Sequence, residues 1–86
     1  MLMHNLTIIE LEIISVIDMK TFKEGWRIVA RYGYGTGEGY RVGPRFDEYE
    51  DADETANQLE KKYPLPTPLE NIVTFFETPG IIRKTS

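Results

Sequence analysis

The segment WRIVARYGYGTGEGYRVGPRF, residues 26–46, has alternating side chains on both sides of a glycine-rich run. Apolar residues alternate with arginines in each half, the period-two pattern of a strand with one buried face. The glycines relieve the steric limit on positive φ and so suit a hairpin loop. We therefore expect two antiparallel strands. The predicted core face carries Trp26, Ile28, Ala30, Tyr32, Tyr40, Val42 and Phe46.

An earlier strand is expected over residues 6–17, the most apolar run of the chain. β-branched residues dominate it, and Glu10 and Glu12 alternate with its aliphatic residues. A helix is the alternative, because several of the aliphatic residues also recur at helical spacing. The adjacent pair Ile13 and Ile14 breaks strict alternation, so either a bulge occurs there or the second half is buried on both faces.

Two helices are expected after the strands, over residues 51–63 and 68–77. Asp51 and Glu54 have the spacing of a capping box at the start of the first helix, and Pro64 ends it. A strand is the alternative for the second segment. The predicted core side of the second helix carries Leu69, Ile72, Val73 and Phe76.

The expected fold is a single α+β domain over residues 1–86, a three-stranded antiparallel sheet in β-β-β-α-α order with both helices on one face. Residues 18–25 are expected to form a polar connection between the first two strands. Pro44 removes an amide donor, so the third strand should end there or lie at an edge. Residues 81–82 would add a short strand or pack as a tail. The terminal residues 1–5 and 83–86 are expected to be flexible.

The residue types present exclude several kinds of active site. The chain has no cysteine, which excludes disulfides, thiolate metal sites and a cysteine nucleophile. Its one histidine, His4, cannot by itself form a triad or a histidine metal cluster. The glycine run fails the phosphate-loop spacing, because Glu38, Tyr40 and Val42 stand where a third glycine would be required. We therefore expect no catalytic residue, no metal and no cofactor, and a protein that is not an enzyme.

The apolar run at residues 6–17 is too short to span a bilayer and is interrupted by Glu10 and Glu12. No basic n-region of a signal peptide precedes it. A cytoplasmic location and no membrane partner are therefore expected. The net charge of −4 argues against generic nucleic-acid binding, whose affinity comes mostly from cations that meet phosphates.

Charge is segregated along the chain. Residues 26–46 contain four arginines and one acid, whereas residues 47–60 contain seven acids and no base. Neighbouring elements of opposite sign give a small protein two different surfaces. The acidic corner is defined as Asp47, Glu48, Glu50, Asp53 and Glu54. The arginine face is defined as Arg27, Arg31, Arg41 and Arg45, with Tyr34 and Tyr40 available for base stacking.

The arginine face has an alternative interpretation, local neutralisation. Glu10 and Glu12 of the first strand alternate onto the same side of the predicted sheet. Cross-strand pairs with Arg27 or Arg31 would then occupy half of the positive charge. We favour this neutralised arrangement over a free cationic patch.

Residues 46–52, FDEYEDA, join the third strand to the first helix. The segment resembles the F-x-T-x-x-E-A junction of integrase arm-binding and plant AP2-type domains, with Glu48 in place of the threonine. Those families lay a three-stranded sheet in a DNA groove. The resemblance implies DNA contacts from Arg27, Arg31, Arg41 and Arg45.

The function expected from these features is protein binding without catalysis. A regulator, an inhibitor or a small subunit of an assembly would fit, and small phage-encoded inhibitors have comparable size and charge. Nucleic-acid binding through the arginine face is the alternative. A homodimer is also open, because the apolar first strand could pair across a two-fold axis.

Overall fold

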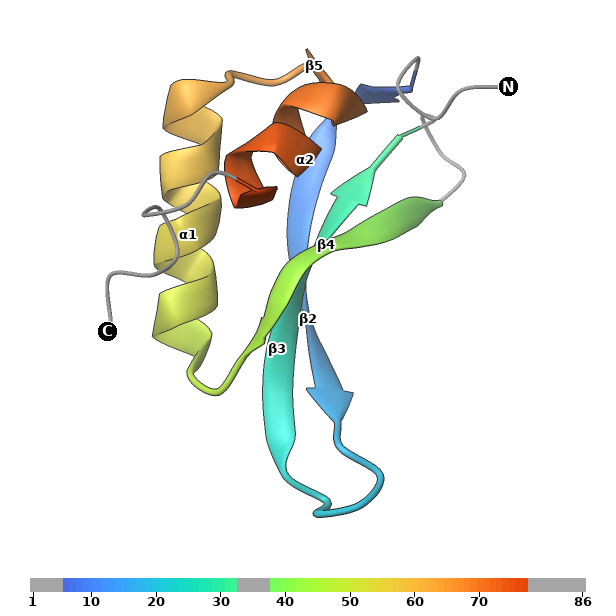
Figure 1. Ribbon diagram of the computed structural model, residues 1–86, viewed down its shortest axis with the longest axis vertical. Coiled ribbons are helices and arrows are strands. Elements are labelled where there is room, and N and C mark those ends of the chain that lie inside the picture. The colour runs from blue at the N-terminus through green and yellow to red at the C-terminus, as the bar shows by residue number, and fades with distance from the viewer. Residues whose placement is uncertain (1–5, 33–37, 78–86) are drawn as a thin grey trace.

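The computed structural model describes residues 6–32 and 38–77. Three strands form an antiparallel sheet in the order β2-β3-β4, and two helices that follow contact it (Figure 1). This confirms the expected α+β class. The elements are β1 Thr7–Ile8, β2 Glu10–Ile17, β3 Glu24–Arg31, β4 Gly39–Phe46, α1 Tyr49–Lys62, β5 Thr67–Pro68 and α2 Leu69–Glu77.

The sheet follows the alternation of its sequence. Ile28 on the central strand β3 lies between Ile13 of β2 and Val42 of β4, and all three share one face. Strand β4 lies at an edge and contains Pro44, as expected.

Of the two alternatives for Ile13 and Ile14, a bulge or burial on both faces, the bulge is wrong, because β2 pairs with β3 without interruption there. Both side chains are half-buried. The irregularity lies in β4, between the partners of Ile28 and Trp26. Gly43 in that segment has a φ of 75°, a conformation that β-branched isoleucines rarely adopt. The segment over residues 6–17 is instead divided at Ile9 into β1 and β2.

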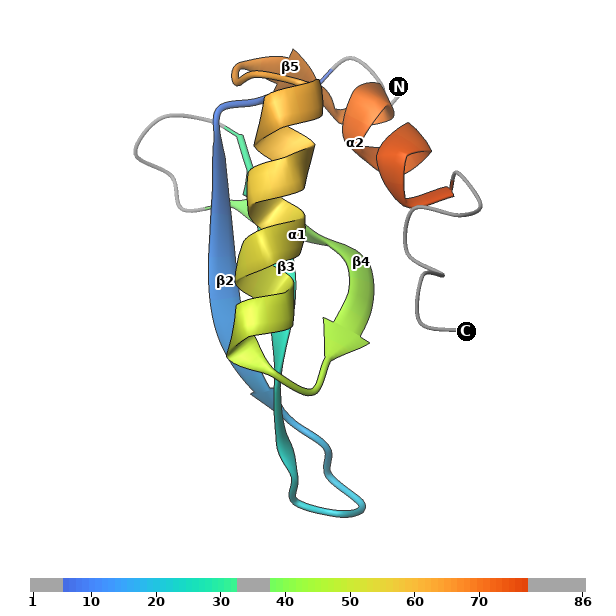
Figure 2. The same cartoon turned by 90° about the vertical axis from the view of Figure 1, so that its left-hand side faces the viewer.

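Helix α1 lies along one face of the sheet (Figure 2). It begins at Tyr49, two residues before the expected start, and Glu48 occupies the N-cap position without a side-chain hydrogen bond. The capping box was therefore a wrong prediction. The ring of Tyr49 instead packs edge-on against Trp26, with 6.2 Å between ring centroids. The first residue of the helix therefore contacts the central strand of the sheet.

Helix α2 settles the alternative at residues 68–77 in favour of a helix. Its buried residues are Leu69, Ile72 and Phe75, so the expected core side was shifted. Val73 is 40% exposed, and Phe76 is half-buried against the Phe75 ring. Helix α2 contacts β4 and β5, and Phe76 packs at the margin of the core cluster.

The short pair β1–β5 was not expected from the sequence. Thr7 pairs with Pro68 and Ile8 with Thr67, so Pro68 is a strand residue and not the first residue of α2. Asn71 donates a side-chain hydrogen bond of 3.0 Å to the Thr67 hydroxyl, which joins this pair to the first turn of α2.

The core is assembled from both ends of the described chain. Flexibility was expected for residues 1–5 and 83–86, and a short strand or a packed tail for residues 81–82. All of these positions lie outside the described residues. The buried cluster consists of Ile8, Ile28, Ala30, Val42, Leu59, Leu69, Ile72 and Phe75.

Candidate interaction surfaces

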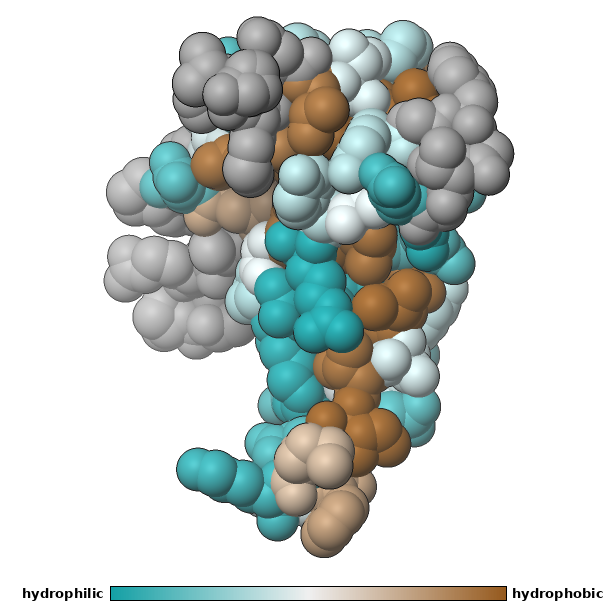
Figure 3. Space-filling model, turned by 90° about the vertical axis from the view of Figure 1, so that its right-hand side faces the viewer, coloured by the Kyte–Doolittle hydropathy of each residue, from teal (hydrophilic) through white to brown (hydrophobic). Residues whose placement is uncertain are grey.

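Among residues 6–32 and 38–77, no helix covers the face of β2 and β3 opposite α1 (Figures 1 and 2). Cross-strand register places the acids and two aliphatic residues of β2 beside the arginines of β3 on this open face. Figure 3 shows a hydrophilic band that runs beside a hydrophobic one along it. The open face carries Glu10, Glu12, Ile14 and Val16 from β2, and Gly25, Arg27, Val29 and Arg31 from β3.

Three of the four predicted arginines are held by contacts within the chain. Arg31 forms an ion pair with Glu12, and Arg27 donates a hydrogen bond of 2.8 Å to the Gly43 carbonyl. Arg45 binds Asp47 at 2.7 Å. The neutralised arrangement is therefore the observed one at Arg31, with Glu12 as the partner. Within residues 6–32 and 38–77, Arg41 alone of the four is exposed without a hydrogen bond or ion pair.

Of the two tyrosines proposed for base stacking, Tyr40 is described and does not lie on the arginine face. Tyr40 lies opposite Ala30 on the core side of the sheet, where it stacks on Tyr32 with 5.4 Å between ring centroids. A hydrogen bond to the Glu38 carboxylate, together with desolvation, raises the pKa of Tyr32 to about 12. Tyr34 lies outside the described residues. Tyr40, the described ring of the predicted pair, is thus on the opposite side of the sheet from the arginine face.

The acidic corner lies on the turn before α1 and on the first turns of that helix. All five of its side chains are exposed. Glu50, Asp53 and Glu54 lie three and four residues apart, so they occupy neighbouring positions on the helix surface. Asp47 forms an ion pair with Arg45. Among the described residues, no other Lys or Arg forms an ion pair with a residue of the acidic corner.

A surface that the sequence analysis missed lies at the end of the β2–β3 hairpin, over residues 17–23, which we call the hairpin tip. The hairpin extends beyond the lower end of α1 (Figure 1). Met19 is 78% exposed, Phe22 is 74% exposed and Ile17 is 55% exposed. The available signal was the presence of two large apolar residues, Met19 and Phe22, in a connection with too few residues to return them to the core.

Hydrogen bonds fix the turn of the hairpin tip. The Asp18 carboxylate accepts hydrogen bonds from the amides of Lys20 at 2.8 Å and Thr21 at 3.4 Å. These bonds hold the pKa of Asp18 below its ordinary value. Phe22 donates its amide to the Asp18 carbonyl at 2.6 Å and has a φ of 60°, in the left-handed region that glycine and asparagine favour. A bulky aromatic residue is therefore held in an unusual backbone conformation and points to solvent.

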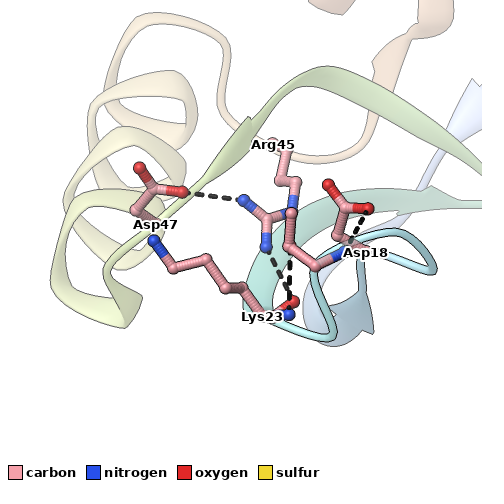
Figure 4. Close-up of polar contacts among 5 residues, drawn as sticks. Asp18, Lys23, Arg45 and Asp47 are labelled. Atoms are coloured by element: carbon pink, nitrogen blue, oxygen red, sulfur yellow. Dashed lines mark hydrogen bonds and ion pairs between the residues drawn. The ribbon is translucent and has the colours of Figure 1, made fainter.

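Arg45 joins the hairpin tip to the acidic corner (Figure 4). Its guanidinium binds the Asp47 carboxylate at 2.7 Å and donates to the Lys23 carbonyl at 3.0 Å. The guanidinium lies over Gly25, where a Cβ would be 2.5 Å from the Arg45 Cζ. The two surfaces are consequently held together at one end of the molecule.

Comparison with protein-family models, with curated proteins and with solved structures finds no match for this chain. The resemblance at residues 46–52 is therefore not accompanied by a family match. Within residues 6–32 and 38–77, no group of three or more metal-binding side chains is placed to hold an ion. No helix among those same residues is long and apolar enough to cross a bilayer.

Proposed function

We propose that this chain is a non-catalytic binding module that acts through protein–protein contacts, as a regulator, an inhibitor or a small subunit. The exposed apolar residues of the hairpin tip carry this proposal. Met19 and Phe22 are more than 70% exposed, although hydrogen bonds order the turn that holds them. Large apolar side chains that an ordered turn presents to solvent are characteristic of interaction sites.

The surroundings of the hairpin tip favour a protein partner. Interfaces concentrate binding energy in a few aromatic or long side chains, surrounded by a polar rim. Phe22 and Met19 would supply the anchor, and Lys20, Lys23 and the acidic corner would supply the rim. Because the acidic corner is exposed and mostly uncompensated, we expect the partner to present a basic surface next to an apolar pocket.

The test compares capture of partners from the native source by three forms of the chain. The double variant Met19→Ser/Phe22→Ser should lose the specific partner, with affinity at least tenfold lower, because an aromatic anchor is worth about 2 kcal/mol or more. The matched control Val73→Ser removes an exposed apolar side chain from α2 and should retain the partner. Equal binding by both variants would contradict the proposal.

A triple charge reversal tests the role of the acidic corner. Glu48→Lys, Glu50→Lys and Asp53→Lys leave Asp47 and its ion pair with Arg45 intact, so the hairpin contacts persist. We expect slower association with the partner and a weaker salt dependence. An unchanged association rate at low salt would remove the acidic corner from the interface.

The alternative function is nucleic-acid binding through the open face. The exposed side chain of Arg41 supports it, and so does the fact that neither described helix covers that face. Contacts of Arg27, Arg31 and Arg45 within the chain would compete with phosphate. Titration of a random duplex and a single strand at about 50 mM salt tests it, because low salt strongly favours phosphate contacts. Binding that Arg41→Gln weakens would support this alternative, and no binding would exclude it.

A further inference from the structure

The two edges of the sheet differ in how they are protected against pairing with another strand. Strand β4 is interrupted by a register shift, contains Pro44 and a Gly43 with a φ of 75°, and packs against α2. Bulges, prolines and covering helices are the usual protection of an edge. Strand β2, Glu10–Ile17, has no proline, glycine or lysine and pairs with β3 in unbroken register.

Strand β2 is also apolar on both of its faces. Leu11 and Ile13 lie on the side of α1, whereas Ile14 and Val16 lie on the open face, and all four are only half-buried. In Figure 3 the hydrophobic band runs along the β2 side of the open face toward the hairpin tip. Within residues 6–32 and 38–77, only β3 pairs with β2, so its outer edge is unpaired. A long, regular and apolar edge strand is a template for pairing with another chain.

We propose that β2 pairs antiparallel with β2 of a second copy of this chain, about a two-fold axis at Ile13. The two sheets would then form one six-stranded sheet with both α1 helices on the same side. The interface would be isologous, as a two-fold dimer requires.

The positions of the carboxylates select this register. With the axis at Ile13, Glu12 lies opposite Ile14 of the second copy and Glu10 opposite its Val16. An axis at Glu12 would place Glu12 opposite itself. Axes at Ile14 and Ser15 would place Glu10 and Glu12, respectively, opposite Asp18 of the second copy. Because like charges directly opposite one another destabilise a sheet, only the axis at Ile13 is free of such a pair among these four.

The pairing goes beyond the proposed function and leaves its surface accessible. The two β2 strands run in opposite directions, so the two hairpin tips lie at opposite ends of the six-stranded sheet. Each α1 keeps its acidic corner on the outer surface. A dimer would therefore present two copies of the proposed binding surface, and failure of dimerisation would leave the single surface unaffected.

Molar mass measured by light scattering, from about 5 to about 500 μM protein, tests the pairing. The mass should rise from the chain value of 10.0 kDa towards twice that value with increasing concentration. A mass that stays at the single-chain value over the whole range would overturn the proposal.

Two substitutions at one position test the register. Ile14→Glu places a carboxylate opposite Glu12 of the second copy, whereas within one chain it faces Arg27, so the fold is retained. We expect its dimer dissociation constant to rise about tenfold or more, because the two-fold axis repeats the like-charge pair. In the Ile14→Lys chain the lysine faces the same Glu12 with opposite charge. This variant should dimerise at least as tightly as the wild-type chain.

Val73→Glu and Val73→Lys are the matched controls, because Val73 is exposed on α2, away from β2. Both should leave the dissociation constant unchanged. Circular dichroism at low concentration checks that every variant is folded. Equal weakening by Ile14→Glu and Ile14→Lys would overturn the register, since an axis at Ile14 predicts that result.

Discussion

Phe22 combines a left-handed backbone with an exposed ring. Its φ is 60° and 74% of the residue is exposed, so little packing offsets the steric cost of a Cβ in that region. We predict that Phe22→Gly raises the free energy of unfolding by about 0.5–1 kcal/mol. For a domain of this size the midpoint of thermal unfolding should rise by about 3–6 °C.

Met19→Gly is the control for that substitution. Met19 is equally exposed in the same turn but does not have a positive φ, so glycine should leave stability unchanged or lower it slightly. A Phe22→Gly chain no more stable than Met19→Gly would mean that the backbone at position 22 is not strained. If the proposed function is right, the more stable Phe22→Gly chain also binds its partner more weakly.

Asp18 makes the hairpin tip sensitive to acid. Backbone hydrogen bonds from Lys20 and Thr21 hold its pKa below the ordinary value of 3.8, and Arg45 adds a smaller effect. Because the folded-state pKa is the lower one, the stabilisation is present above about pH 3.8 and is lost as the pH falls through the folded-state pKa.

Asp18→Asn tests this pH dependence. The amide oxygen of asparagine can still accept the two hydrogen bonds but does not titrate. We expect the wild-type hairpin amides to exchange faster as the tip opens below about pH 4, relative to core amides, and the variant to lack this change. NMR-detected hydrogen exchange measures it, and identical profiles for the two chains would contradict the assignment to Asp18.

At the level of elements, two glycines control how neighbouring segments meet. A Cβ at Gly43 would lie 2.5 Å from the Phe76 ring of α2, and the φ of 75° adds backbone strain. The nearest atoms to a Cβ at Gly25 all belong to the flexible end of Arg45. We predict that Gly43→Ala lowers the free energy of unfolding by about 2–3 kcal/mol. Gly25→Ala should lower it by less than about 1 kcal/mol, because the guanidinium can move.

Urea denaturation of both variants measures the difference. In the Gly25→Ala chain, the further substitution Arg45→Gln should have little effect, because the first change already displaces the guanidinium. Equal losses from the two alanine substitutions would show that Phe76 does not hold α2 against β4 as described.

Alternation in the sequence was sufficient to predict the sheet faces. A period of two fixes which residues share a face, so the sequence placed the acids of β2 and the arginines of β3 on one side. It did not select Glu12 as the partner of Arg31, because alternation does not set the cross-strand register. The start of α1 could not be predicted in the same way. The N-cap Glu48 forms no side-chain hydrogen bond, so the local capping pattern gave no signal, and the first helical residue, Tyr49, contacts Trp26, which is distant in sequence.

The candidate surfaces were predicted only in part. The acidic corner was visible because its residues are contiguous in sequence and hydrophilic. Arg27 donates to the Gly43 carbonyl and Arg45 to the Lys23 carbonyl. Because every residue has a backbone carbonyl, the sequence does not indicate which of them will accept such a hydrogen bond. The exposure of the hairpin tip depends on where α1 begins relative to the hairpin, which is a property of the assembled fold.

The whole molecule depends on a small core. An 86-residue domain is stabilised by about 5–15 kcal/mol at most, so one large cavity removes much of that stability. Ile72 is fully buried in the cluster that joins α2 to the sheet. We predict that Ile72→Ala lowers the free energy of unfolding by about 2–4 kcal/mol.

Val73→Ala, the next residue on the exposed side of α2, is the control and should change stability by less than about 0.5 kcal/mol. Chemical denaturation of both variants at low protein concentration separates this effect from any contribution of association. A small effect of Ile72→Ala would mean that α2 is not part of the cooperative unit.

The β1–β5 pair has a consequence for the order of events when the chain folds. Ile8 pairs with Thr67, and the cluster around Ile8 also needs Leu69 and Phe75. Contacts of such large sequence separation slow folding, because a long loop must close before they form. During synthesis, a ribosome-bound chain that ends before α2 could form the β2–β3 hairpin. It would lack the core residues that α2 contributes. We therefore expect protection from protease to appear only after Phe75 has emerged.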